Sequence, residues 1–242
     1  MFYGNHRLGR GKAMPGKTFS KVIKFIRLVF SIVLFLALFF LPAGTLKWTE
    51  AWILIVFYLV SVLGVIIWLK KNDPGLLKER SQRKKNVKTW DRILMLVYVF
   101  FLMIMLCITG LDAVRFQWSN VHIILKIIGF LGFIPGFVLG FWAMRENTYL
   151  SDTVRIQEER GHKVCNTGPY RYVRHPMYIG IIIAMLCFPF ALGSYYALIP
   201  AVVIVFLFVF RTVLEDKTLQ EELSGYKEYT ETVRFKLIPG VW

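Results

Sequence analysis

The side chains best suited to chemistry are concentrated in residues 162–180, where a long apolar block begins. This stretch mixes hydrogen-bond donors, acceptors and aromatic rings, and Gly168-Pro169 supplies turn chemistry. Pro176 opens the apolar block, and proline suits a first helical turn because its missing N–H leaves no donor unpaired. The free N–H groups of that turn can hold an anion, with His175 beside them. Singly these are ordinary interfacial residues, but the cluster predicts a binding site.

A second concentration of polar residues begins where the last apolar block ends, at Arg211, Glu215 and Asp216. Arg211 and Glu215 are four residues apart and therefore share one helical face. An exposed ion pair at this spacing stabilises a helix by only about 0.3–0.5 kcal/mol. Ionisable groups at the edge of an apolar region are nevertheless costly unless they pair or bind a ligand. Beyond them, residues 223–242 alternate aromatic and charged side chains, which is typical of a segment folded back under a membrane.

Apolar segments must position these clusters. The chain has 242 residues, of which 56% are hydrophobic and 19% charged, whereas a soluble domain has roughly 45–50% apolar and about 25% charged residues. The mean hydropathy is +0.54. The excess lies in blocks near the length of a membrane span, which excludes a soluble enzyme and a disordered chain. The blocks are residues 22–41, 50–69, 93–111, 122–143, 177–193 and 195–211.

The blocks predict an all-α, polytopic integral membrane protein with about six transmembrane helices. Each of the first four can cross a hydrocarbon core of about 30 Å at about 1.5 Å per residue. The last two are shorter and are separated by Leu192-Gly193-Ser194, so we expect a short hairpin. We expect residues 1–143 to hold a basic tail and the first four spans. Residues 144–242 would form the functional core, with a pocket at the cytoplasmic face.

The formal net charge of +15 follows from where the basic residues lie. Of the 30 Lys and Arg, 27 fall at the two ends of the chain or in residues 70–92 and 144–176. Only Lys47, Arg115 and Lys126 lie on or near the opposite side. This asymmetry is the positive-inside signature, and it predicts that both termini are cytoplasmic. A nucleic-acid partner is not needed to explain the charge, and we expect none.

Two patterns suggest ligands that the sequence context does not support. Residues 11–18 match the phosphate-loop pattern GxxxxGK[ST], but that loop needs a buried strand before it and a soluble helix after it. A short polar tail precedes the pattern here and an apolar block follows, which favours a flexible basic tail.

The cysteines, Cys107, Cys165 and Cys187, are scattered. They form neither a disulfide framework nor a metal-ligand spacing, so we expect no metal.

Glycines recur in the fourth apolar block, where Gly132, Gly136 and Gly140 lie four residues apart. Small residues at this spacing let two helix backbones approach closely. Packing against another span of the same chain is favoured over a dimer interface, although an oligomer through these glycines stays open.

Together the two polar clusters resemble a known family, that of the isoprenylcysteine carboxyl methyltransferases, which is related to the membrane phospholipid methyltransferases. The resemblance covers roughly residues 147–242, and the first three apolar blocks match only in hydropathy. It implies an all-helical membrane fold that binds S-adenosylmethionine at the cytoplasmic face. A lipid-like or prenylated substrate would enter from the bilayer. The residues that carry the resemblance are Gly168-Pro169-Tyr170, Arg174-His175-Pro176, Tyr178, Gly180, Glu215-Asp216, Leu219, Tyr226 and Tyr229.

The resemblance also implies roles for individual residues. Glu215 would act in catalysis as well as in cofactor binding, and Arg211 would orient the substrate carboxylate. The residues implied to bind the cofactor are Gln157, His162, Val164, Cys165, Tyr170, His175, Pro176, Tyr178 and Glu215.

These residue types suit the cofactor on chemical grounds. Tyrosine faces attract a sulfonium cation by about 0.5–2 kcal/mol. Glu215 can bind the ammonium group, and His175 with the helix start can bind the carboxylate. If the methyl acceptor is a carboxylate, the nucleophile is already ionised, so the protein's task is alignment and exclusion of water.

Other acceptors and other functions stay open. The acceptor could be the carboxylate of a prenylated cysteine, an amine-bearing lipid or a small thiol. We favour the carboxylate, because an amine or thiol must lose a proton and would leave Arg211 without a role. A sterol-type membrane reductase is the main competing enzyme, because Lys163, Arg171 and Arg174 could bind the phosphate of NADPH. A scaffold or transporter is disfavoured, because the spans hold almost no ionisable residues to line a pathway.

Overall fold

The computed structural model describes residue 30, residues 32–82 and residues 86–242. All regular structure in this part of the chain is helical, which confirms the expected all-α class. The phosphate-loop pattern at residues 11–18 and the start of the first apolar block lie outside the described residues. The longer helices are Ile32–Ala43, α2 (Thr49–Asn72), α3 (Pro74–Ser81), α4 (Thr89–Gly110, continued by a π-helix at Leu111–Phe116), α5 (Ile123–Glu146), α6 (Pro176–Leu192), α7 (Leu198–Glu222) and α8 (Tyr226–Thr232).

Four of these helices are long and apolar enough to cross a membrane. They are α2, α4 with its π-helical continuation, α5 and α7, with 24, 28, 24 and 25 residues. They correspond to the second, third, fourth and sixth apolar blocks of the sequence. Helix α6, with 17 residues, and the described helical segment Ile32–Ala43 are apolar but shorter. Four candidate spans are therefore established, whereas the count of six stays a prediction.

Helix α7 continues beyond the end of the last apolar block. The block ends at residue 211 and the helix at Glu222, so Arg211, Glu215 and Asp216 lie within one helix, as the helical face expected for Arg211 and Glu215 requires. Arg211 and Asp216 do not end the helix because both are buried and bonded to other parts of the fold. The expected hairpin with α6 is present at Gly193, but only its first arm is short.

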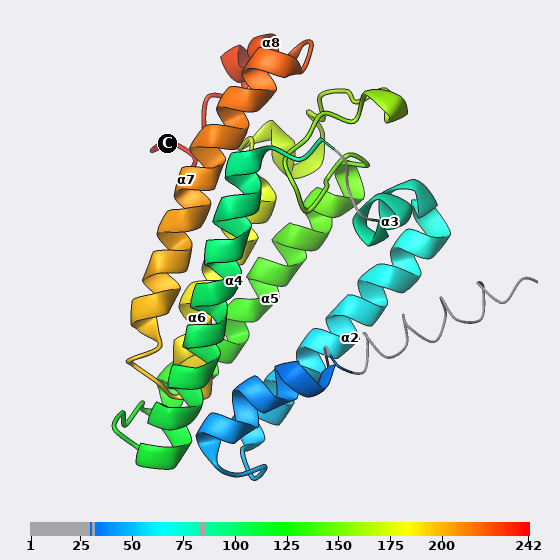
Figure 1. Ribbon diagram of the computed structural model, residues 1–242. Coiled ribbons are helices and arrows are strands. Elements are labelled where there is room, and N and C mark those ends of the chain that lie inside the picture. Colours follow the sequence, from blue (N-terminus) through cyan, green and yellow to red (C-terminus); the bar gives the residue numbers. More distant parts are fainter. Residues whose placement is uncertain (1–29, 31, 83–85) are drawn as a thin grey trace, which may run out of the picture.

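Helices α4, α5, α6 and α7 run side by side as a bundle, and α2 leans away from it (Figure 1). The most extensive packing is between α5 and α6. A Cβ on Gly136 would lie 2.8 Å from the Gly180 carbonyl oxygen, and a Cβ on Gly132 would meet Cys187. These two glycines therefore serve packing within the chain, the arrangement that the sequence favoured. Gly140 has no atom within 4 Å of such a Cβ.

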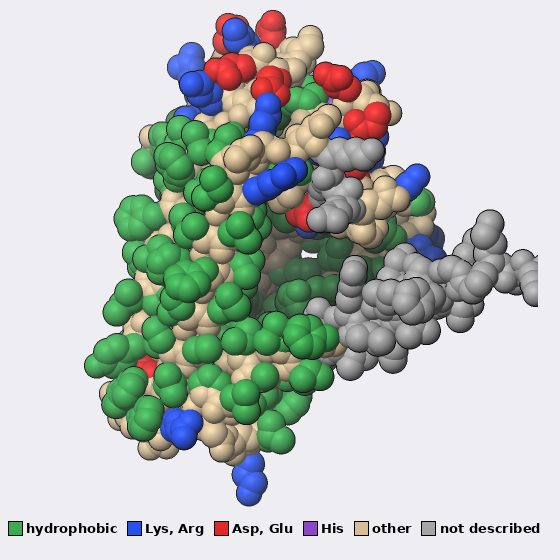
Figure 2. All heavy atoms as spheres, in the orientation of Figure 1, with side chains coloured by type: hydrophobic (Ala, Val, Ile, Leu, Met, Phe, Trp, Pro, Cys, Tyr) green, Lys and Arg blue, Asp and Glu red, His purple; other side chains and the backbone are tan. Residues whose placement is uncertain are grey.

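Charged side chains gather at one end of the molecule, while hydrophobic side chains cover its middle (Figure 2). Many apolar residues of α2 and α5, such as Leu63 and Ile128, are exposed. Water does not favour such a belt, but lipid does. The charge-rich end, as we call it, includes the start of α4 and α6, the end of α5 and α7, and all of α8 (Figure 1).

Candidate functional site

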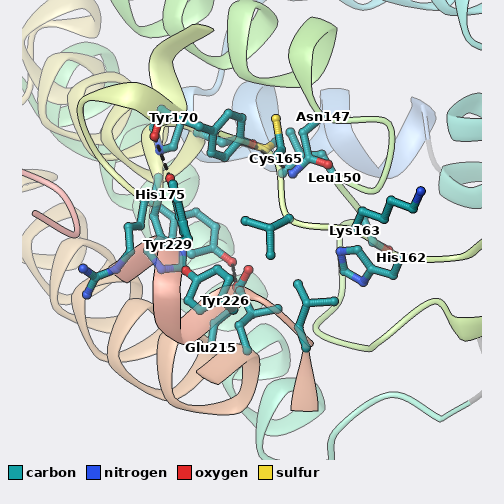
Figure 3. A pocket seen from close by; sticks show the side chains of 18 residues that line it. Asn147, Leu150, His162, Lys163, Cys165, Tyr170, His175, Glu215, Tyr226 and Tyr229 are labelled. Carbon is teal, nitrogen blue, oxygen red and sulfur yellow. Dashed lines mark hydrogen bonds between the residues drawn. The ribbon is translucent and has the colours of Figure 1, made fainter. Parts of the chain in front are cut away.

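A polar hollow opens at the charge-rich end, where α6 begins and α7 ends (Figure 3). Its empty volume, including the part open to solvent, is about 600 Å³. Helix α8 and the loop between α5 and α6 complete its walls. The structure brings together eight of the nine residues that the resemblance implied for the cofactor: His162, Val164, Cys165, Tyr170, His175, Pro176, Tyr178 and Glu215.

The wall before α6 follows from the local sequence. Gly168 has φ +55°, which favours glycine, and it starts a short 3-10 helix at Gly168–Arg171 that buries Tyr170. Backbone N–H groups of Arg174 and His175 then donate to carbonyls of residues 235 and 236, at 2.9 and 3.0 Å. The C-terminal segment thereby holds the residues before α6 in place.

Asp216 is the hub of the site, and the sequence assigned it no role. It is 1% exposed, and Arg174 donates to both of its oxygens, at 2.7 and 3.0 Å. Tyr226 and Gln220 donate to the same carboxylate, at 3.1 and 2.8 Å. The Nε2 of His175 lies 3.3 Å from Oδ1. Because an ionised carboxylate only accepts, Nε2 donates and Asp216 fixes the ring of His175.

Tyrosine rings line much of the hollow. The ring of Tyr178 stacks on that of His175, with centroids 5.7 Å apart and planes at 7°. Tyr226 and Tyr229 meet edge to face at 5.4 Å, and the Tyr229 hydroxyl donates to the Tyr170 carbonyl at 2.6 Å. Burial raises the pKa values of Tyr170, Tyr226 and Tyr229 above those of ordinary phenols. These rings therefore stay neutral and present π faces at physiological pH.

Glu215 contributes the carboxylate that lines the hollow. The Tyr178 hydroxyl donates to it, so one residue from α6 and one from α7 are joined at the floor of the site. Figure 3 shows Glu215 and Tyr226 on one side of the hollow and His162 with Lys163 on the other. A ligand with a positive charge would lie between the carboxylate and a histidine that carries none.

His162 is uncharged at neutral pH, so the stability of the protein should depend on pH. Burial lowers its pKa to about 4, and the like charges of Arg160 and Arg155 add to the effect. In the unfolded chain the pKa is about 6.5, so the unfolded state binds more protons between these values. The stabilising contribution is complete above about pH 6.5 and is lost as the pH falls towards 4.

We therefore expect the melting temperature in detergent to fall between about pH 7.5 and about pH 5, and to fall less for His162→Gln. Thermal unfolding of both proteins at the two pH values measures the difference. Equal losses in the two proteins would contradict this role of His162.

Gln157 is the one implied cofactor residue that does not line the hollow. It is fully buried, its Nε2 donates to the Tyr149 carbonyl at 2.6 Å, and its Oε1 accepts from Arg160 at 2.6 Å. Its backbone N–H donates to Nδ1 of His162 at 3.4 Å. Gln157 thus supports the turn that carries His162 and stands behind the wall of the hollow.

Arg211 is bonded to a residue that the sequence did not single out. Its Nε donates to Asp91 at 2.8 Å and its terminal nitrogen to the Asp152 carbonyl at 3.0 Å. The guanidinium lies 5.3 Å from the centre of the Tyr178 ring. Arg211 therefore does not form the simple ion pair with Glu215 on one helical face. It forms a buried ion pair with Asp91, which joins α7 to α4. Arg211 lines neither the polar hollow nor the apolar cavity described next.

A second, apolar cavity lies between α2 and the bundle, with an empty volume of about 1960 Å³ that includes its open side. Aliphatic and aromatic side chains of Ile32–Ala43, α2, α4, α5 and α6 line it. Figure 2 shows the surface hollowed below the charge-rich end, with hydrophobic side chains around the opening. Met177, in the first turn of α6, lines both the cavity and the polar hollow, so the two spaces adjoin at this side chain.

Comparison with known proteins gives one family. Residues 124–224 match a family model described as phospholipid methyltransferase. The matched region runs from α5 to the residues just beyond α7 and so contains most of the polar hollow. No match to a curated protein is found. The family match confirms the resemblance to membrane methyltransferases that the motifs predicted.

Proposed function

Residues 124–224 match a phospholipid methyltransferase family model, and on this premise we propose that the protein transfers a methyl group from S-adenosylmethionine to a lipid acceptor. The observation that carries the proposal is that a polar hollow and an apolar cavity lie on either side of one residue, Met177, which lines both. A charged donor and a lipid acceptor need sites of opposite chemistry, and methyl transfer requires that the two reactants touch.

The residues of the polar hollow fit the donor. Glu215 offers a carboxylate to the ammonium group, and the Tyr226 ring, which also lines the hollow, offers a π face to the sulfonium. Leu219 and Leu223 give an apolar wall that suits the adenine ring. Bound there, S-adenosylmethionine supplies an electrophilic methyl group. The task of these residues is to align that group with the acceptor and to exclude water.

The same residues suit NADPH less well. Of the three basic residues considered for its phosphate, Arg171 does not line the hollow and Arg174 is held by Asp216 through two hydrogen bonds. Lys163 is left to face the ligand. Phosphate-binding sites gather several cations, so these positions favour the sulfonium donor over the sterol-type reductase.

We propose the amine of a phospholipid head group as the acceptor, with the carboxylate of a prenylated cysteine as the second candidate. The sequence favoured a carboxylate acceptor because Arg211 would then orient it. Arg211 instead donates to Asp91, so this reason for a carboxylate no longer applies. The matching family is also described by its phospholipids. An amine must lose one proton, and His175, which lines the hollow and contacts Asp216 through Nε2, is the base that we propose to accept it. A small thiol would leave the apolar cavity without an occupant.

We further propose that the polar hollow faces the cytoplasm and that both termini lie on that side. The charge-rich end carries most of the basic segments between the apolar helices, and positive residues favour the cytoplasmic side. On this view the chain divides into residues 1–143, which embed it, and residues 144–242, which hold the donor.

Labelled S-adenosylmethionine tests the function. The purified protein is incubated with the labelled donor and either phosphatidylethanolamine or a prenylated cysteine, and the lipids are then separated. We expect label in the phospholipid. Label in the prenylated cysteine alone would move the assignment to the second candidate. Saturable binding of NADPH without any binding of S-adenosylhomocysteine would refute the methyltransferase.

A further inference from the structure

One charged side chain lines the apolar cavity in the part of the chain that the structure describes, and it is Arg80. Arg80 is half-buried near the end of α3, whose first turn is capped by Asp73. The other side chains around the cavity are aliphatic, aromatic, methionine or small, with Tyr58 and Tyr98 among the few that carry a polar atom. A guanidinium in such surroundings is costly unless an anion pairs with it.

Within the described residues the Arg80 guanidinium has one hydrogen bond, to the Leu150 carbonyl at 2.9 Å, and no ion pair. The neighbouring carboxylate of Glu79 is engaged by Arg155, at 3.0 and 2.8 Å. Burial lowers the pKa of Arg80, but an arginine stays protonated in proteins. The side chain thus carries a positive charge and several donors that face an apolar space.

The position of Arg80 links the two spaces. Leu150, whose carbonyl accepts from Arg80, lines the polar hollow. Met177 lines both spaces, and Leu77, Leu150 and Met177 belong to one small apolar cluster. An anion at Arg80 would therefore lie at the end of the cavity that adjoins the donor site, with Leu150 between the anion and that site.

We propose that Arg80 binds the phosphate of the acceptor phospholipid, while the acyl chains occupy the apolar cavity. The inference rests on the proposed function and adds to it the group by which the acceptor is recognised. A guanidinium pairs with phosphate through parallel hydrogen bonds, which fix orientation as well as position. Because Leu150 separates Arg80 from the polar hollow, the group held by Arg80 is not the reacting one. When Arg80 binds the phosphate of the phospholipid, the ethanolamine group that follows the phosphate can extend past Met177 to the methyl donor.

Substitution on one helix tests the proposal. Methylation of phosphatidylethanolamine is measured for the wild type, Arg80→Gln and Arg80→Lys, with Lys78→Gln as the matched control because Lys78 is exposed on the same helix and lies outside the cavity. We expect Arg80→Gln to raise KM by about 10- to 100-fold, the loss of one charge-assisted contact, with little change in kcat. Arg80→Lys should recover part of this loss, and Lys78→Gln should match the wild type. An unchanged KM in Arg80→Gln would refute the proposal.

A binding measurement separates this inference from the methyltransferase assignment. The full chain in detergent is titrated with fluorescent phosphatidylmethanol, which has the phosphate but no amine, and with diacylglycerol of the same chains. The wild type should prefer the phospholipid, and Arg80→Gln should bind both equally, whether or not methylation occurs. Equal binding by the wild type would refute the role of Arg80 even if the enzyme is active. Stronger competition by a free fatty acid than by the phospholipid would overturn the choice of phosphate over carboxylate.

Discussion

Replacing Asp91 by asparagine is expected to lower the free energy of unfolding by about 3–5 kcal/mol, because breaking a buried ion pair leaves an uncompensated charge. Asp91 is 0% and Arg211 6% exposed, and their contact joins the start of α4 to α7. The second oxygen of Asp91 also accepts from the Val154 backbone, so one carboxylate secures two helices and the loop beside the polar hollow. Reversible unfolding in mixed micelles or thermal unfolding in detergent measures the loss.

Two further variants make this expectation specific. Lys88, the residue before α4, forms an ion pair with Glu222, the last residue of α7, but the two side chains are 31% and 39% exposed. Lys88→Gln should therefore cost less than about 1 kcal/mol. The double variant Asp91→Leu with Arg211→Met removes both charges, and it should recover most of the stability that Asp91→Asn loses. If Asp91→Asn were as stable as Lys88→Gln, the ion pair between Asp91 and Arg211 would not stabilise the contact of α4 with α7.

Glu215→Gln is expected to weaken binding of S-adenosylmethionine by about 10- to 100-fold, since a hydrogen bond to a charged group contributes about 1.5–3 kcal/mol. Glu215 is the carboxylate that the proposed function gives to the donor's ammonium group, and glutamine keeps its size without its charge. Isothermal titration with S-adenosylhomocysteine, which retains that ammonium group, measures the affinity without turnover.

Glu221→Gln is the matched control, because Glu221 lies on the same helix, is exposed and pairs with Lys217 outside the hollow. Its affinity for S-adenosylhomocysteine should equal that of the wild type. An unchanged affinity in Glu215→Gln, with the melting temperature preserved, would remove Glu215 from the donor site and with it the orientation proposed for the donor.

The sequence by itself determined the class of the protein and the neighbourhood of its site. Hydropathy and block length are local properties, so the second, third and fourth apolar blocks were predicted as full-length spans without knowledge of their packing, whereas the sixth was expected to be shorter than α7 is. The residues from His162 to Tyr178 are close in the chain, so they had little freedom to lie far apart. The motif that joined them to Glu215 indicated a resemblance to membrane methyltransferases, and the family match over residues 124–224 confirms that resemblance.

Only the tertiary structure decided which charges pair and where space is left. Arg211 faces Asp91, which is 120 residues away, and this contact depends on how α4 and α7 pack. The length of α7 could not be predicted from hydropathy, because its buried charges are stabilised by partners on other elements. The several hydrogen bonds of Asp216 and the position of Gln157 behind the wall of the hollow also depend on tertiary contacts, which the sequence does not specify locally. The apolar cavity and the place of Arg80 in it are likewise properties of the assembled helices, because a cavity is defined by side chains that are distant in the sequence and near in space.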